Sequence, residues 1–139
     1  MLNKVIFVFM ILSNVNQEIA QSLNVFGEKL ELCCNSPKTG FYRDGFCNTG
    51  SSDVGTHVVC SVMTQEFLEF SKTKGNDLTT PNEAYSFPGL LPGDKWCLCV
   101  LRWKEAYDAG KAPKVYLEGT HDKALKYVTI KQLIEHALK

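Results

Sequence analysis

The pattern of hydrophobic and polar positions in this chain predicts strands that alternate with helices. The run Thr56–Met63 is rich in β-branched and apolar residues, which is typical of a strand. Thr64 follows it as an N-cap, and the helix behind it extends through Lys74 and ends at Gly75. We therefore expect a first strand–helix unit over residues 56–74.

Two further units follow the same order. Lys95–Leu101 is apolar on both faces, as a covered central strand would be, and the helix after it stops at Gly110. Lys114–Glu118 predicts a third strand, followed by a short helix behind Thr120. The last helix begins after Thr129 and carries an amphipathic stripe formed by Ile130, Leu133, Ile134, Ala137 and Leu138.

This order of elements predicts the α+β class, or α/β, with a small mixed sheet of about three to five strands covered by about four helices. Strand–helix–strand order favours partly parallel pairing, and the arm Asn24–Leu32 would add an antiparallel edge. The loops Asn35–Gly55 and Asn76–Asp94 are each about twenty residues long. Their aromatic residues Phe41, Tyr42, Phe46 and Phe87 indicate packed, ordered loops. Because binding residues concentrate on long loops, we expect these two to carry the site.

Composition indicates one globular domain, which we place at residues 23–139. The chain has 139 residues, of which 45% are hydrophobic and 22% charged, as in an ordinary folded domain. Lysine and arginine number 15, and aspartate and glutamate also number 15. Since phosphate binding requires a basic excess, this balance argues against nucleic acid as a partner.

Residues 1–22 predict a signal peptide. Lys4 precedes the apolar run Val5–Leu12, which is too short to span a bilayer and matches a signal-peptide core. Ala20 and Ser22 supply the small residues at a cleavage site. Cleavage would leave an exported protein, periplasmic or extracellular, with no membrane span. The alternative is a native N-terminal strand or helix of a cytoplasmic protein, which the polar stretch Ser13–Ile19 favours.

Six cysteines carry the most distinctive chemistry of the sequence: Cys33, Cys34, Cys47, Cys60, Cys97 and Cys99. Cys97 and Cys99 are separated by one strand residue, so both point to one face about 6 to 7 Å apart and are poorly placed to bond each other. Together with Cys60 on a neighbouring strand, and with Cys47 or His57, they predict a site for zinc or another soft metal.

Other interpretations of the cysteines stay open. Cysteine is among the most buried residue types, so Cys60, Cys97 and Cys99 are equally explained as small core residues. An exported protein would instead form disulfides, for which six cysteines allow fifteen complete pairings. Cys47 lies in a polar loop near Arg43 and is the best placed of the six to be a reactive thiol.

Two histidines are candidate general bases for such a thiol. His57 opens the first strand and His121 opens the short helix after the third, and from either position the ring can serve as base or ligand. A histidine that caps a helix or fills the core is the simpler explanation for each. Cys47, His57 and His121 are thus the catalytic candidates.

The candidate ligand contacts are polar and aromatic residues of the loops and the second strand: Arg43, Asp44, Asn76, Asp77 and Trp96. Arg43 and Asp44 suit a carboxylate or phosphate ligand, but they also suit a pair across a turn. Asp77 is more simply explained as a turn residue than as a catalytic one. The sequence contains no glycine-rich phosphate loop, nucleophile elbow or zinc-protease motif.

Three motifs resemble one family. They are TGFYRDGFCNTG at residues 39–50, GNDL at residues 75–78, and FPGLLPGDKWCLC at residues 87–99, which is followed by Arg102 and Trp103. With them, the chain resembles domain-of-unknown-function family 2237 from about Asn24 to Leu138. The resemblance implies a small single-domain protein, mostly bacterial, with no assigned activity.

The resemblance also bears on the cysteines. The family pattern implies cysteines at the positions of Cys34, Cys47, Cys60, Cys97 and Cys99, with Cys33 as a local addition. An odd set leaves at least one cysteine unpaired, so it favours thiol or metal chemistry over a pure disulfide scaffold.

Three functional hypotheses follow. The first is a module that binds a small ligand or a soft metal through clustered thiols. The second is a thiol enzyme or redox protein with Cys47 as nucleophile. The third is a disulfide-stabilised exported domain that binds another protein through the aromatic side chains of Tyr85, Phe87 and Trp96.

Overall fold

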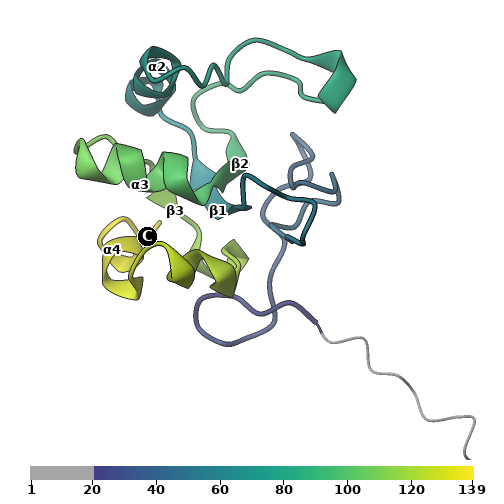
Figure 1. Ribbon diagram of the computed structural model, residues 1–139, viewed down its shortest axis with the longest axis vertical. Helices are drawn as coiled ribbons and strands as arrows, with labels where there is room; N and C mark the ends of the chain where they lie inside the picture. Colours follow the sequence, from purple (N-terminus) through teal and green to yellow (C-terminus); the bar gives the residue numbers. More distant parts are fainter. Residues whose placement is uncertain (1–20) are drawn as a thin grey trace, which may run out of the picture.

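A computed structural model describes residues 21–139, and the predicted signal peptide lies almost entirely outside these residues. The described chain is of the α+β class. Its strands are β1 (His57–Val62), β2 (Lys95–Cys99) and β3 (Lys114–Val115), and its α-helices are α2 (Gln65–Thr73), α3 (Val100–Asp108) and α4 (Ile130–Glu135). Short 3₁₀ helices occupy Glu83–Tyr85, Leu117–Gly119 and Asp122–Lys126. Figure 1 shows α3 crossing the sheet between α2 and α4.

The starts of α2 and α4 follow from the capping residues predicted for them. The hydroxyl of Thr64 accepts the N–H of Phe67 at 3.0 Å and begins α2. Thr129 begins α4 with a reciprocal pair: its hydroxyl accepts the N–H of Gln132 at 3.1 Å, and its own N–H donates to the Gln132 side chain at 2.9 Å. Both caps satisfy backbone donors that a helix end leaves unpaired.

β1 is the central strand of the sheet, with β2 on one side and β3 on the other, and both pairings are antiparallel. The chain leaves β1 and returns to β2 at the same end. There the N–H of Met63 donates to the carbonyl of Asp94, and the N–H of Gly93 donates to the carbonyl of Met63, both at 2.8 Å. The prediction of partly parallel pairing was therefore wrong. α2 and the loop after it bring the chain back at the end of the sheet where β1 stops, so β2 runs antiparallel to β1.

The C-terminal part and the N-terminal arm also differ from the prediction. The expected short helix after β3 is the 3₁₀ helix Asp122–Lys126. α4 stops short of the chain end: the N–H of Leu138 donates to the carbonyl of Val115 at 2.8 Å, so this tail runs beside β3. The arm Asn24–Leu32 makes isolated bridges and adds no edge strand.

The two faces of the sheet bury different side chains. Val59 and Leu98 pair across β1 and β2 and belong to the main apolar core, together with side chains of α2, α3 and α4. Trp103 of α3 is fully buried there, and its indole N–H donates to a backbone carbonyl at 3.2 Å. The next pair along the strands, Cys60 and Cys97, belongs to a separate cluster of four buried cysteines. Alternate strand residues point to opposite faces, which explains this division.

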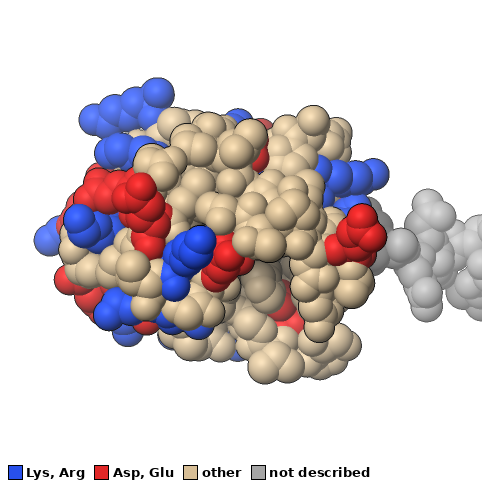
Figure 2. All heavy atoms as spheres, turned by 90° about the horizontal axis from the view of Figure 1, so that it is seen from above, with Lys and Arg blue, Asp and Glu red and all other residues tan. Residues whose placement is uncertain are grey.

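The surface carries charges of both signs. On the face seen in Figure 2, basic and acidic side chains are interspersed among uncharged ones, and neither sign covers the face continuously. Within residues 21–139, no helix has the length and apolar character needed to cross a membrane. The two long loops lie on the same side of the molecule, beside β2 (Figure 1).

Candidate functional site

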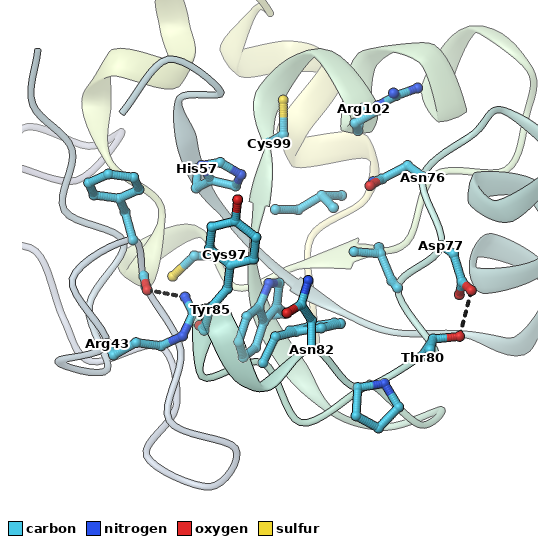
Figure 3. A pocket seen from close by; sticks show the side chains of 17 residues that line it. Arg43, His57, Asn76, Asp77, Thr80, Asn82, Tyr85, Cys97, Cys99 and Arg102 are labelled. Carbon is cyan, nitrogen blue, oxygen red and sulfur yellow. Dashed lines mark hydrogen bonds between the residues drawn. The ribbon is translucent and has the colours of Figure 1, made fainter. Parts of the chain in front are cut away.

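A cavity of about 750 Å³ lies between the two long loops and β2. We call it the loop pocket (Figure 3). It is lined by Gly40, Phe41 and Arg43 of the first loop, by Asn76, Asp77, Leu78, Thr80, Pro81, Asn82, Tyr85 and Phe87 of the second, by His57, by Trp96–Cys99, and by Arg102. Most of the residues that the sequence marks as ligand contacts are therefore brought together here.

Arg43 joins the two loops. Its backbone is in the left-handed region (φ 53°). Its guanidinium donates to the carbonyls of Gly40 (2.6 Å), Tyr85 (2.9 Å) and Ser86 (3.3 Å), and it lies 4.8 Å above the ring of Trp96. Burial lowers the pKa of Arg43 from its ordinary value. Among the described residues no carboxylate lies within ion-pair distance of this guanidinium, so its charge has no acidic partner.

Asp77 and Asp44 have local roles. Asp77 accepts the hydroxyl of Thr80 at 2.6 Å and both the hydroxyl and the N–H of Thr79, at 2.7 and 2.8 Å. These hydrogen bonds, with that of Thr80 first, hold the pKa of Asp77 well below its usual range. Asp44 accepts the N–H of Phe46 at 3.0 Å and lies outside the loop pocket. Both carboxylates thus stabilise turns, the simpler of the two explanations considered from sequence.

His57 stands at one end of the loop pocket, and Asp53 holds its ring. The Nδ1 atom of His57 lies 2.6 Å from Oδ1 of Asp53. The other carboxylate oxygen accepts the backbone N–H of His57 and the hydroxyl of Thr49, both at 2.9 Å. Burial acts to raise the pKa of Asp53, but these bonds, led by the imidazole, outweigh it and lower the pKa. Because Nδ1 is engaged by a buried carboxylate, Nε2 is the ring nitrogen left for a ligand.

The backbone around His57 is shaped to this ring. A Cβ at Gly55 would lie 2.5 Å from Cε1 of His57, so only glycine leaves room for the imidazole. Thr56 has φ 49°, a conformation that a β-branched residue rarely adopts. Sequence reasoning found His57 and missed Asp53, although the spacing Asp-x-Gly-x-His was a usable signal.

Cys99 lies opposite His57 on the neighbouring strand of the sheet. The two are Cα partners in the β1–β2 ladder, next to a bulge between His57 and Val59. Cys99 has a free, half-buried thiol, and it is the residue from which α3 begins. Figure 3 shows both side chains at the same end of the pocket. No hydrogen bond joins them in the described structure.

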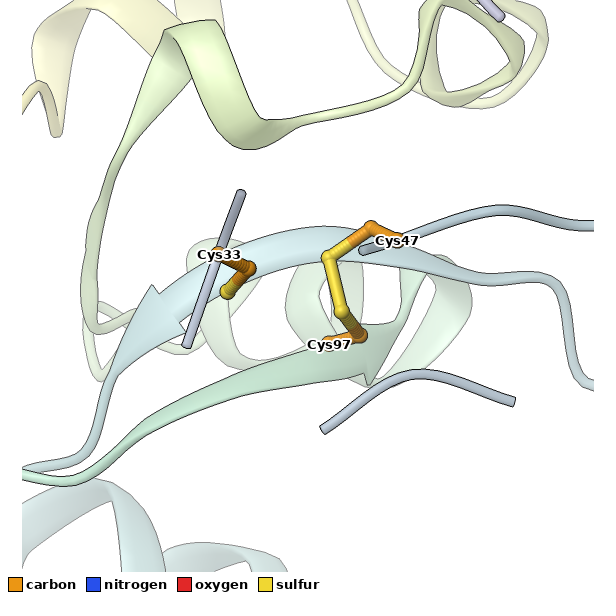
Figure 4. A group of neighbouring side chains, drawn as sticks. All are labelled: Cys33, Cys47 and Cys97. Atoms are coloured by element: carbon orange, nitrogen blue, oxygen red, sulfur yellow. A yellow bond between two sulfur atoms is a disulfide. The ribbon is translucent and has the colours of Figure 1, made fainter. Parts of the chain in front are cut away.

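The other strand cysteines are paired. Cys33 bonds to Cys60 and Cys47 bonds to Cys97, and all four residues are buried in one cluster. Figure 4 shows the Cys47–Cys97 disulfide with Cys33 beside it. The sulfurs of Cys33, Cys47 and Cys97 lie within 4.8 Å of one another. The sequence predicted a cluster of four cysteines that included Cys99. In the structure Cys33 takes that place in the cluster. In this oxidised form the four sulfurs offer no thiolate to a metal, and Cys47 offers none to a substrate.

His121 lies apart from the loop pocket. Its Nδ1 accepts the N–H of Lys123 at 3.0 Å, so His121 caps the 3₁₀ helix Asp122–Lys126. Burial, the largest influence, lowers the pKa of His121, and Asp122 opposes this effect. The helix-capping alternative thus describes His121, and His57 is the catalytic candidate that lines the pocket.

One family model matches residues 23–137, described as an uncharacterized protein conserved in bacteria, DUF2237. The chain belongs to this family. Membership confirms the resemblance seen in the sequence motifs. No curated protein matches this DUF2237 chain. Its function must therefore be argued from the loop pocket and the cysteines.

Proposed function

We propose that this protein binds a small organic anion with a flat apolar body in the loop pocket. The observation that carries the proposal is the Arg43 guanidinium, which lies over Trp96 and whose charge has no acidic partner within residues 21–139. A cavity of about 750 Å³ falls within the range of roughly 300 to 1,000 Å³ that small-ligand sites occupy. Phe87, edge-on to Trp96 at 5.3 Å between ring centroids, extends the apolar wall.

The ligand chemistry follows from these walls. An anionic group near Arg43 would meet the guanidinium donors that the three carbonyls leave free, since this side chain has five N–H groups. An aromatic or planar body would pack on Trp96 and Phe87. Asn82 uses its side-chain oxygen to accept the N–H of Ala84 at 3.1 Å, which leaves its amide N–H₂ for a ligand.

A fluorescence titration tests the proposal. Benzoate is added at low ionic strength and the emission of Trp96 is followed, with benzamide, a neutral ligand of the same shape, as control. We expect saturable quenching by benzoate, weaker binding at high salt, and no response in Trp96→Phe, where Trp103 remains as a buried reference. Equal affinity for benzamide, or no saturable response to benzoate, would contradict an anion site.

A second function is proposed for the reduced protein: binding of zinc or another soft metal by the four buried cysteines. It is supported by three sulfurs within 4.8 Å of one another and by the preference of Zn²⁺ for thiolates. The ligand set would be Cys33, Cys47, Cys60 and Cys97, without Cys99 or His57. Native mass spectrometry after reduction and addition of Zn²⁺ should show one bound ion, and Cys33→Ser should abolish it. Zinc retained by Cys33→Ser, or no zinc in the reduced wild type, would overturn this assignment.

We also infer that the protein is exported after cleavage of residues 1–22. Two disulfides are compatible with an oxidising compartment. The intact mass of the protein recovered from bacteria expressing the full chain tests this. A mass that lacks residues 1–22 is expected, and an unprocessed N-terminus in the cytoplasmic fraction would contradict export.

A further inference from the structure

A free thiol, and an imidazole held by a buried carboxylate, lie at one end of the loop pocket. Asp53 is 3% exposed and holds Nδ1 of His57 at 2.6 Å. His57 lines the pocket and has 40% of its side chain exposed. Cys99 is the strand partner of His57. Among the described residues that line the pocket, Cys99 is the one with a free thiol, since Cys97 is bonded to Cys47.

The strand pairing places Cys99 and His57 opposite each other on neighbouring strands. In a regular antiparallel pair, opposed residues have Cβ atoms about 4.5 to 5.5 Å apart, whereas the register of this ladder shifts between His57 and Val59. The reaction proposed below requires a turn of the Cys99 side chain about its Cα–Cβ bond that directs its sulfur toward Nε2 of His57. The bulge beside His57 is a device that re-aims side chains and occurs often next to active sites.

Several features fix the imidazole in a single orientation. Asp53 binds both the ring and the backbone N–H of His57. Phe41 stacks on the ring at 6.3 Å between centroids. Gly55 provides the space that the ring fills. A general base must be held by a third group in this way to act on a nucleophile, as in the serine and cysteine triads.

We propose that the protein catalyses acyl transfer to water, with Cys99 as nucleophile, His57 as general base and Asp53 as the residue that positions His57. The inference rests on the proposed function, since the acyl donor would occupy the same pocket. The substrate class is a small ester or thioester.

The reaction is balanced without an oxidant or reductant. His57 Nε2 accepts the thiol proton as Sγ of Cys99 bonds to the carbonyl carbon, and the bond from that carbon to the leaving group breaks as the leaving group takes the proton from His57. Water then attacks the acyl thioester, gives a proton to His57, and the carbon–sulfur bond breaks. His57 returns that proton to the thiolate. The products are a carboxylic acid and an alcohol or thiol.

The test uses 4-nitrophenyl acetate with the non-reduced full chain. The expected result is a burst of one nitrophenolate per chain, with one acetyl group mapped to Cys99 by mass spectrometry. Cys99→Ser should abolish both, whereas Cys34→Ser, which removes the other free thiol, should leave both unchanged. Acetylation of Cys34 at an equal rate, a burst that survives in Cys99→Ser, or no burst in the wild type would overturn the proposal.

Two further variants separate base catalysis from folding. His57→Gln should lower the acylation rate at least about 100-fold, the lower end of what a general base contributes. Asp53→Asn should lower the same rate while benzoate affinity, read from Trp96 fluorescence, stays unchanged. If Asp53→Asn weakens binding and acylation equally, its role is structural only and its assignment as a positioning residue fails.

The outcomes distinguish this inference from ligand binding. Saturable benzoate binding without acetylation of Cys99 would leave the anion site standing and reject catalysis. Acetylation of Cys99 that benzoate does not inhibit would place the reaction outside the anion site and reject the shared pocket. Both readouts together, with inhibition by benzoate and none by benzamide, are the result that we expect.

Discussion

Removal of the Cys47–Cys97 disulfide should destabilise the protein strongly. The two cysteines are 50 residues apart, and in the chain-entropy treatment a loop of that length corresponds to about 4 kcal/mol of stabilisation. The Cys33–Cys60 disulfide spans 27 residues, which corresponds to about 3.5 kcal/mol. Each value is a large share of the roughly 5 to 15 kcal/mol by which a typical domain is stable.

The two disulfides should differ in their effect on the loop pocket. Cys47 lies in the loop that carries Arg43, and Cys97 lines the pocket. Cys33 precedes that loop and Cys60 lies in β1, and neither lines the pocket. We expect the double variant Cys47→Ala/Cys97→Ala to lose benzoate binding, and Cys33→Ala/Cys60→Ala to retain it after a similar loss of stability.

The assay is urea unfolding followed by circular dichroism without reductant. Benzoate titrations of the same samples are made below the unfolding transition. Midpoints are compared at a common slope, since a changed slope would indicate a different unfolded state. A loss of under about 1 kcal/mol in Cys47→Ala/Cys97→Ala, within the range of an ordinary substitution, would refute the reasoning. Equal benzoate affinity of the two double variants would refute the prediction that the two disulfides differ in their effect on the loop pocket.

Three further predictions concern single residues. Gly55→Ala should shift the NMR resonances of the His57 ring, because the new Cβ would lie 2.5 Å from Cε1; an unchanged spectrum would contradict this packing. The stability gap between wild type and Asp53→Asn should be full at pH 7 and shrink below about pH 4. The sign follows from the lowered pKa of Asp53, whose ionised form stabilises the fold, and a constant gap in urea midpoints would disprove it. Thr129→Ala should cost about 1 kcal/mol in urea unfolding by removing the cap of α4, and any loss of benzoate affinity would contradict the separation of α4 from the pocket.

The starts of α2 and α4 were predictable from sequence because their signals are local. Thr64 and Thr129 cap helices through bonds to residues three positions later, so a short window contains the whole interaction. The direction of strand pairing in the sheet has no such local signal. The antiparallel return to β2 depends on Met63 meeting Gly93 and Asp94, thirty or so residues later, and nothing local distinguishes this return from a crossover.

The position of the candidate site was predictable in part, because long loops can be recognised in the sequence. The long loops were expected to carry binding residues, and Arg43, Asn76, Asp77 and Trp96 do line one pocket. The pairing of cysteines was beyond sequence, because it is decided by which strands and loops meet. Cys33 illustrates this: it lies in an arm without a strand pattern, yet the arm carries it against Cys60 of β1.

The central claim is that four cysteines are buried in two disulfides, whereas Cys34 and Cys99 are free and Cys99 lines the loop pocket. Alkylation of the native, non-reduced protein with iodoacetamide, followed by peptide mapping, tests it most directly. We predict labels on Cys99 and Cys34, the two free thiols, and disulfide-linked peptides that join Cys33 to Cys60 and Cys47 to Cys97. A label on any of those four residues, or a disulfide that includes Cys99, would contradict the account.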